Sequence, residues 1–182
     1  MMVRLETWPG AAMALALAAS TQAAVVQIAP SGFAVRHETT VNAPPAKVYD
    51  ALVQVGSWWN PDHSFSGDVK NLSIDARAGG CFCERLKDGG AVEHLRVVYV
   101  APGQALRMSG ALGPLQASGL AGSLTWKLVP AASGTKMELT YSVGGFIDGG
   151  FDKMAPAVDG VLGEQLERLK RFVETGKPAA AN

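Results

Sequence analysis

Alternation of apolar and polar residues is the strongest pattern in this chain. It first appears in FAVRHETTVNA (33–43) and is cleanest in LAGSLTWKLV (120–129) and TKMELTYSV (135–143). Residues two apart in a strand share a face, so each segment predicts a strand with one dry side. Repeated one-sided strands are typical of an antiparallel sheet that packs one face against a core.

Shorter strands are predicted between the first and the last of these segments. Asp88-Gly89, Pro102-Gly103 and Gly113-Pro114 mark turns, and Gly79-Gly80 marks a bulge or kink. The intervening strands are VKNLSIDARAGG (69–80), CFCERLK (81–87), AVEHLRVVYV (91–100) and ALRMSGAL (105–112).

Two segments change to a period of three to four residues and predict helices. PPAKVYDALVQV (44–55) begins with two prolines, which suit a first helical turn. FDKMAPAVDGVLGEQLERLKRFVETG (151–176) carries a longer apolar stripe, which predicts an amphipathic helix that ends at Gly176.

The order of elements predicts an α+β fold. We expect a twisted antiparallel sheet of seven strands around a long C-terminal helix, with one or two short helices after the first strand. The long helix is the only predicted element large enough to cover the dry face. A twisted sheet wrapped around one helix commonly leaves space between them, so we expect a ligand cavity there.

The N-terminal residues predict a secretory signal peptide. Arg4 precedes AAMALALAAS (11–20), an apolar run too short to span a bilayer, and Thr21 and Ala23 fit the −3 and −1 positions of a cleavage site. We therefore expect export to the bacterial periplasm, with no membrane span in the mature form. The predicted organisation is a signal peptide (1–23), an N-terminal linker (24–32), one domain (33–176) and a disordered tail (177–182).

Composition narrows the function classes. Sixteen basic and sixteen acidic residues cancel in a chain of 182 residues, so charge gives no reason to expect nucleic acid or an anionic membrane surface as a partner. The sequence holds no nucleophile-elbow, phosphate-loop or dinucleotide-binding motif. C-x-C is not a usual zinc spacing, and we predict no metal and no cofactor.

Four segments carry a family resemblance: APPAKVYDALVQVGSWWNP, RAGGCFCERL, VVYVAPGQALRMSG and GVLGEQLERLKRFVE. In this order they resemble the START-like, or SRPBCC, superfamily, whose helix-grip fold is also seen in birch-pollen-allergen-like proteins. The chain looks most like the branch of polyketide cyclases and homologues of the heat-shock-chaperone ATPase activator, over about residues 33–175. The resemblance implies a hydrophobic cavity between sheet and helix. It implies no single activity, because the superfamily spans lipid carriers, hormone receptors and cyclases.

The adjacent tryptophans in GSWWNPDHSFSGD (56–68) must point in different directions on any regular element. We interpret Trp58 or Trp59, or both, as a wall of the cavity mouth. An inward Glu84 in an apolar pocket is expected to have a raised pKa or to meet a polar ligand group. The other predicted ligand-binding residues are Phe82, Tyr99, Met108, Trp126, Tyr141, Phe151, Met154, Val158 and Leu162.

The register of the hairpin 81–100 decides which polar groups meet. With a two-residue loop at Asp88-Gly89, Cys83 lies opposite His94 and Phe82 faces Leu95. Val97 and Tyr99 then continue the dry face. A three-residue loop changes the parity and sets Glu84 beside His94. The pattern favours the first register, but either gives a candidate catalytic pair, thiol with imidazole or carboxylate with imidazole.

Cys81 and Cys83 are the only cysteines. In a regular strand their Cα atoms would lie about 6.6 Å apart, from two steps of roughly 3.3 Å. That distance is at the upper edge of what a disulfide spans, so the sequence leaves their redox state open.

These observations predict a protein that binds a hydrophobic or amphipathic small molecule, as an exported carrier or sensor. One alternative is a cyclase-, dehydratase- or hydrolase-like enzyme that uses Glu84, His94 or Cys83 in the same cavity. A second alternative is a protein-interaction module with exposed aromatic contacts and an unidentified protein partner.

Overall fold

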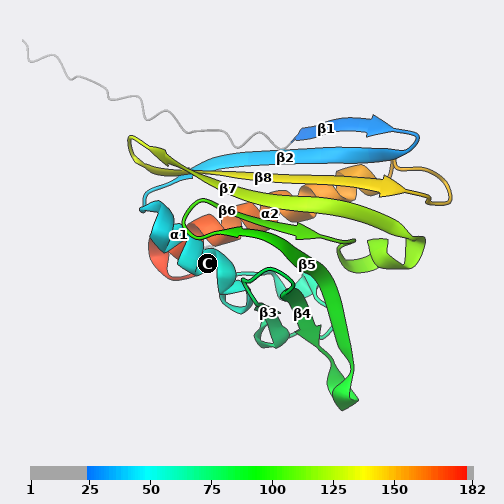
Figure 1. The fold of residues 1–182 in the computed structure, drawn as a ribbon, viewed down its shortest axis with the longest axis horizontal. Coiled ribbons are helices and arrows are strands. Elements are labelled where there is room, and N and C mark those ends of the chain that lie inside the picture. Colours follow the sequence, from blue (N-terminus) through cyan, green and yellow to red (C-terminus); the bar gives the residue numbers. More distant parts are fainter. Residues whose placement is uncertain (1–23, 180–182) are drawn as a thin grey trace, which may run out of the picture.

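The computed structural model describes residues 24–179 and shows a twisted antiparallel sheet that curls along a long helix (Figure 1). The sheet has eight strands in the order β1-β2-β8-β7-β6-β5-β4-β3. This confirms the predicted α+β helix-grip fold, with one strand more than expected. The strands are β1 (Ala24–Ala29), β2 (Gly32–Val41), β3 (Leu72–Ile74), β4 (Cys81–Arg85), β5 (Ala91–Ala101), β6 (Ala105–Ser109), β7 (Leu120–Ala131) and β8 (Gly134–Gly145).

The additional strand is β1, where the sequence predicted a linker. It lies at the sheet edge and pairs with β2 from Ala24↔Arg36 to Ala29↔Gly32. AVVQIA has no apolar–polar alternation, so a period-2 pattern does not reveal this strand, although it forms a hairpin with the next one. The predicted signal peptide (1–23) lies outside the described residues.

Two α-helices flank the concave side of the sheet. α1 (Pro45–Val53) follows β2, and α2 (Met154–Thr175) runs along the sheet and ends at Gly176, whose φ of 76° is the left-handed conformation of a helix C-cap. The buried face of α2 carries Ala155, Leu162, Gln165, Leu166, Leu169 and Val173. None of the described helices is long and apolar enough to cross a membrane.

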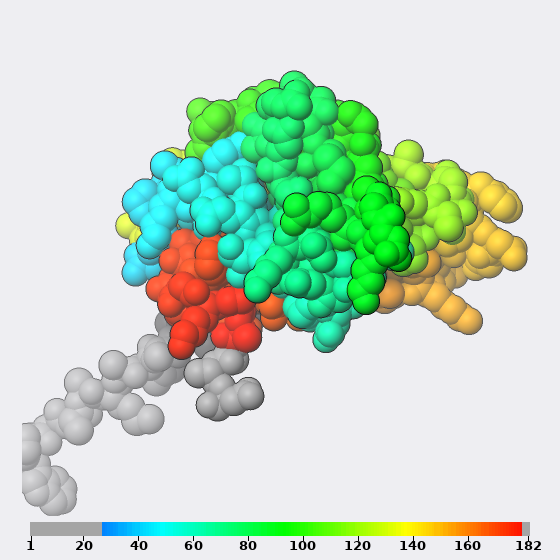
Figure 2. All heavy atoms as spheres, turned by 90° about the horizontal axis from the view of Figure 1, so that it is seen from below, coloured from blue at the N-terminus to red at the C-terminus, as the bar shows by residue number. Residues whose placement is uncertain are grey.

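The segment between α1 and β3 contains three short 3-10 helices: η1 (Val55–Ser57), η2 (Pro61–His63) and η3 (Val69–Asn71). In Figure 2 this segment (turquoise) lies between the end of α2 (red) and the β4–β5 hairpin (green). Arg168 of α2 donates hydrogen bonds to the carbonyls of Trp58 and Trp59, at 2.9 and 3.1 Å. Gln165 of α2 accepts one from the Asn60 N–H at 2.9 Å. These contacts fix the segment to the helix.

The β4–β5 hairpin has a three-residue loop, Lys87–Gly89, closed by a hydrogen bond from the Leu86 N–H to the Gly90 carbonyl at 2.8 Å. The favoured two-residue loop was therefore wrong. Phe82 still pairs with Leu95, as that register required, because the pairing shifts between Phe82 and Cys83. The pairing expected for a two-residue loop therefore holds on the Phe82 side of the bulge. The pairing expected for a three-residue loop holds on the Cys83 side, next to the turn.

A second shift on β5, between Val97 and Tyr99, reverses the faces again. Tyr99 was predicted to continue the dry face, but its side chain is 48% exposed. A strict alternation drawn across a bulge assigns every later residue to the wrong face.

Candidate functional site

An apolar cavity of about 380 Å³ opens between the β4–β5 hairpin and the N-terminal half of α2. Its volume falls within the range of small-molecule sites, about 300–1,000 Å³. Four polar residues line it: Asp62, His63 and Ser64 of the segment after α1, and His94 of β5. The apolar walls are Trp59, Phe65, Phe82, Leu112, Pro114, Leu115, Met154, Ala157, Val158, Val161 and Leu162. The cavity therefore favours a mainly apolar guest.

The two tryptophans divide between core and cavity. Trp58 is 1% exposed, and its indole N–H donates to the carbonyls of Ala51 and Leu52 at the end of α1. Trp59 lines the cavity, and its indole N–H donates to the His63 carbonyl at 2.9 Å. Both indole donors are thus satisfied, and only Trp59 presents its ring to the opening.

Aromatic rings form a continuous row from the core to the cavity. Centroids lie 6.0 Å apart between Trp126 and Trp58, 5.6 Å between Trp58 and Trp59, and 5.4 Å between Trp59 and Phe82. The imidazole of His94 continues the row, 4.9 Å from Phe82. Such contacts pack with tilted or edge-on geometry and give the cavity a rigid wall.

Glu84 lies on β4, two residues after Phe82, and is fully buried. Its carboxylate accepts hydrogen bonds from the backbone N–H groups of Phe65 and Ser66, and it contacts His94 Nε2 at 2.9 Å. Burial alone acts to raise the pKa of Glu84, but the hydrogen bonds from Ser66, Phe65 and His94 outweigh it and hold the pKa below its usual value. The predicted inward position is confirmed, whereas the expected raised pKa was wrong.

His94 is the one polar residue of the cavity lining that is buried. It is 5% exposed and lines the cavity wall. Burial lowers the pKa of His94 more than the hydrogen bond to Glu84 raises it, so the imidazole is neutral at pH 7. Because Glu84 is ionised, Nε2 carries the proton and donates a hydrogen bond to the carboxylate, which leaves a lone pair on Nδ1. Among the described residues, no group hydrogen-bonds to Nδ1.

The structure brings together only part of the predicted ligand-binding set. Trp59, Phe82, Met154, Val158 and Leu162 line the cavity, and Glu84 supports His94 behind it.

Trp58, Trp126 and Met108 pack in the core, around a separate void of only about 10 Å³. That is about the space of one water, so these three residues do not face a ligand-sized opening.

Tyr141, Phe151 and Tyr99 also lie away from the cavity lining. The Tyr141 hydroxyl donates to the Gly110 carbonyl and accepts from the Leu112 N–H, both at 3.0 Å, and burial raises the pKa of Tyr141 to about 12. The Tyr141 hydroxyl therefore fixes the segment Gly110–Leu112, and with it the position of Leu112 in the cavity wall. Phe151 packs on Phe33, with ring centroids 5.7 Å apart. Tyr99 lies on the outer face, under the guanidinium of Arg107.

Cys83 is not available as a thiol in this structure, because Cys81 and Cys83 form a disulfide with a Cα–Cα distance of 5.4 Å. The predicted thiol–imidazole pair is therefore absent, and the carboxylate–imidazole pair takes its place. Among residues 24–179, no group of three His, Cys, Asp or Glu residues is arranged to hold a metal ion.

Sequence reasoning missed the segment Leu112–Leu115 and Phe65 as cavity walls. Leu112 was placed at the end of the predicted strand 105–112 and Gly113-Pro114 was predicted as a turn, but η5 (Gly113–Ser118) folds this stretch over the cavity. The apolar residues within that stretch, Leu112 and Leu115, were the available signal.

The family model for polyketide cyclase/dehydrase and lipid transport proteins matches residues 33–174. The chain therefore belongs to this family, within the SRPBCC superfamily that its sequence resembles. No curated protein matches the chain significantly.

Solved structures share the fold at low sequence identity. The Aha1 dimer from Colwellia psychrerythraea is 20% identical, with a TM-score of 0.58, over 79% of this chain and 98% of that one. A conserved protein of unknown function, EF2215 from Enterococcus faecalis, is 18% identical, with a TM-score of 0.59, over 85% and 78%. CalU16 from Micromonospora echinospora is 17% identical, with a TM-score of 0.53, over 81% and 78%. At these identities the comparison shows the fold alone.

Proposed function

We propose that this protein binds an amphipathic small molecule whose apolar body fills the cavity and whose hydroxyl group donates a hydrogen bond to His94 Nδ1. The observation that carries the proposal is the one buried polar side chain of the cavity lining, the imidazole of His94, whose Nε2 is engaged by Glu84 at 2.9 Å. A neutral imidazole with a free lone pair is a hydrogen-bond acceptor, so it selects a donor in the ligand.

The apolar contact area supplies most of the binding free energy in this proposal. Removing about 300 Å² of ligand surface from water yields roughly 7 kcal/mol before the costs of association. One neutral hydrogen bond to a site such as Nδ1 adds about 1 kcal/mol net. The cavity therefore sets the size and apolar character of the ligand, and His94 sets the position of its hydroxyl.

A matched pair of probes tests the proposal. 2-Naphthol and 2-methylnaphthalene have almost the same shape, but only the first donates a hydrogen bond. We expect 2-naphthol to bind about fivefold more tightly, the equivalent of about 1 kcal/mol, and His94→Phe to abolish that difference. Isothermal titration calorimetry measures both affinities. Equal affinities in the wild-type protein would contradict the role of His94, and no binding of either probe would contradict the proposed function.

The Glu84–His94 pair also favours a second candidate function, a hydrolase-like reaction in the same cavity. Nδ1 can take a proton from water as the water oxygen attacks an ester carbonyl, while Glu84 stabilises the imidazolium that forms. With 4-nitrophenyl hexanoate, the C–O bond to 4-nitrophenol breaks and hexanoic acid is the other product. A rate that Glu84→Gln and His94→Phe both abolish, with probe affinity kept in Glu84→Gln, would support this function. A rate equal to that of free imidazole would exclude it.

The expected export remains part of this proposal. The Cys81–Cys83 disulfide supports it, because disulfides persist in oxidising compartments such as the bacterial periplasm. In that setting the protein would act as a carrier or sensor of its ligand. Fractionation of cells that produce the full chain tests the location: recovery of the protein, uncleaved, in the cytoplasm would contradict export.

A further inference from the structure

The Cys81–Cys83 disulfide is poorly suited to a purely stabilising role. It closes a ring of two cysteines and one residue between them, and the stabilisation that a disulfide gives by constraining the unfolded chain is smallest for the shortest loops. β4 is already hydrogen-bonded to β3 on one side and to β5 on the other. The disulfide therefore calls for a local explanation.

The local effect of the disulfide is to shorten β4. The Cα atoms of Cys81 and Cys83 lie 5.4 Å apart, whereas two steps of a regular strand cover about 6.6 Å. On the facing strand, Phe82 pairs with Leu95 and Cys83 pairs with Glu93, so His94 is an additional residue without a partner. The shortened step of β4 thus lies directly opposite the lengthened step of β5.

This mismatch in length decides the face of His94. His94 and Leu95 are consecutive, yet both are buried, as expected at a bulge, whereas in a regular strand with one exposed face one of the two would point outward. If the pairing continued without the bulge from Phe82↔Leu95, Cys83 would pair with His94. His94 would then share the outer face of the sheet with Cys83.

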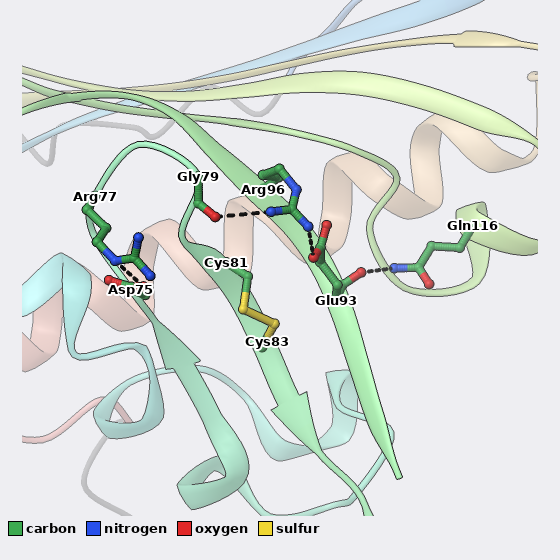
Figure 3. The surroundings of a disulfide bond; sticks show 8 residues. All are labelled: Asp75, Arg77, Gly79, Cys81, Cys83, Glu93, Arg96 and Gln116. Atoms are coloured by element: carbon green, nitrogen blue, oxygen red, sulfur yellow. Dashed lines mark hydrogen bonds and ion pairs between the residues drawn. A yellow bond between two sulfur atoms is a disulfide. The ribbon is translucent and has the colours of Figure 1, made fainter.

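The bulge also separates two carboxylates. In the structure Glu93 points to the outer face, where it forms an ion pair with Arg96 (Figure 3). Without the bulge, Glu93 would pair with Glu84 and share the inner face with it, where the two charges would repel. The bulge is therefore favoured by charge as well as by the short β4 step, and these two influences can be separated by experiment.

We propose that the Cys81–Cys83 disulfide is a positioning element for His94, and that thiol–disulfide exchange on the outer face of β4 controls whether the imidazole reaches the cavity. Both cysteines are only half-buried, so a thiol can approach them. In the exchange, a dithiol gives two electrons and two protons to the sulfurs, the S–S bond breaks, and the dithiol leaves as its own disulfide. β4 then extends, the bulge loses its constraint, and His94 moves away from Glu84. The effect on binding rests on the proposed function, but the movement of His94 does not.

The surroundings of His94 give the movement a measurable signal. Besides Glu84 on β4, the titratable groups at the cavity are Asp62 and His63 of the segment after α1, and the residues of α2 that line the cavity are apolar. Burial is the main cause of the lowered pKa of His94 in the oxidised form. An outward His94 regains water, so its pKa should rise toward the ordinary value, about 6.5.

The test is NMR of the ¹⁵N-histidine-labelled protein, without ligand, before and after reduction with dithiothreitol. In the oxidised protein we expect His94 as the Nε2–H tautomer with a lowered pKa. In the reduced protein we expect a shifted His94 imidazole signal and a pKa higher by several tenths of a unit or more, with the His37 signal unchanged. The variant Cys81→Ser/Cys83→Ser should match the reduced protein and should not respond to dithiothreitol.

Binding of 2-naphthol to the oxidised and the reduced protein is a second readout, and it separates this proposal from the proposed function. If reduction shifts the His94 signal but no probe binds in either state, the positioning role stands and the binding function fails. If the His94 tautomer and pKa are the same in the oxidised protein, the reduced protein and the serine variant, with reduction verified by intact mass, the proposal is overturned. Loss of the dispersed amide spectrum on reduction would equally overturn it, because the disulfide would then hold the whole fold rather than one side chain.

Discussion

Glu84 and His94 show how neighbouring groups, rather than burial alone, decide a charge state. Burial acts against the charged form of both side chains. Glu84 nevertheless stays ionised, because two backbone N–H groups and an imidazole donate to it. His94 has a single strong partner and stays neutral. The pair therefore presents to the cavity an imidazole fixed in one tautomer.

The lowered pKa values of this pair predict that acid weakens the fold. The unfolded chain binds protons at Glu84 and His94 at higher pH than the folded chain does, so the free energy of unfolding should rise with pH. As pH falls, the contribution of His94 is lost first, below about pH 6.5, and that of Glu84 is lost below about pH 4.5.

Urea unfolding at a series of pH values measures this dependence. In His94→Phe the decline between pH 6.5 and pH 5 should be smaller than in the wild-type protein, while the decline near pH 4 should remain. A wild-type stability that stays constant or increases on acidification through this range would contradict the assigned charge states.

At the residue scale the sequence revealed the inward position of Glu84 and offered His94 as a partner in one of two registers, but it did not reveal the backbone donors of the carboxylate. The alternation around Phe82 places Glu84 on the inner face. The donors at Phe65 and Ser66 come from an irregular segment whose path follows from its contacts with α2, and no local pattern predicts such contacts. The expected pKa had the wrong sign for that reason.

Among the elements, α2 lies against β2 at a position where only glycine fits without displacing a neighbour. A Cβ atom at Gly163 would lie 2.9 Å from the His37 ring on β2, whereas one at Gly160 would meet no atom within 4 Å. The two glycines lie in the same helix, three residues apart, and only one of them is needed for packing.

Alanine at these two positions is a matched test of the helix–sheet contact. Gly160→Ala should stabilise the protein by about 0.5–1 kcal/mol, because alanine has the higher helix propensity. Gly163→Ala has the same propensity gain but pushes a methyl group into His37, so it should be less stable than Gly160→Ala by about 1 kcal/mol or more. Thermal or urea unfolding compares them. Equal stability of the two variants would show that α2 does not lie this close to β2.

Elements whose pattern lies within their own residues could be predicted from the sequence, and features that depend on a neighbouring strand could not. β7, β8 and α2 have long uninterrupted periods and were predicted with nearly correct bounds. β1 and the two irregular steps of β5 were missed, because an edge strand without alternation and a bulge both depend on the partner strand. Tyr99 was assigned to the wrong face as a direct consequence.

On the scale of the whole molecule, the interior is filled at one end and open at the other. Trp58, Trp126 and Met108 close the core, with a void of only about 10 Å³. The cavity lies where β5 curves away from the rest of the sheet to form the hairpin with β4 (Figure 1). A twisted sheet over one helix predicted a hollow, but its place depends on the curvature of β5 and on η5, which the sequence pattern did not specify.

A residue-by-residue titration with 2-naphthol, followed by ¹H–¹⁵N NMR, tests the central claim most directly. The account predicts saturable shifts of the Trp59 indole N–H and the His94 imidazole. It also predicts saturable shifts of the backbone amides of Leu112, Gly113, Leu115 and Val158–Leu162. An alternative location is the outer-face groove lined by Tyr99, Gln104 and Arg107. Shifts confined to that groove, or no saturable shift at Trp59 and His94, would contradict the account.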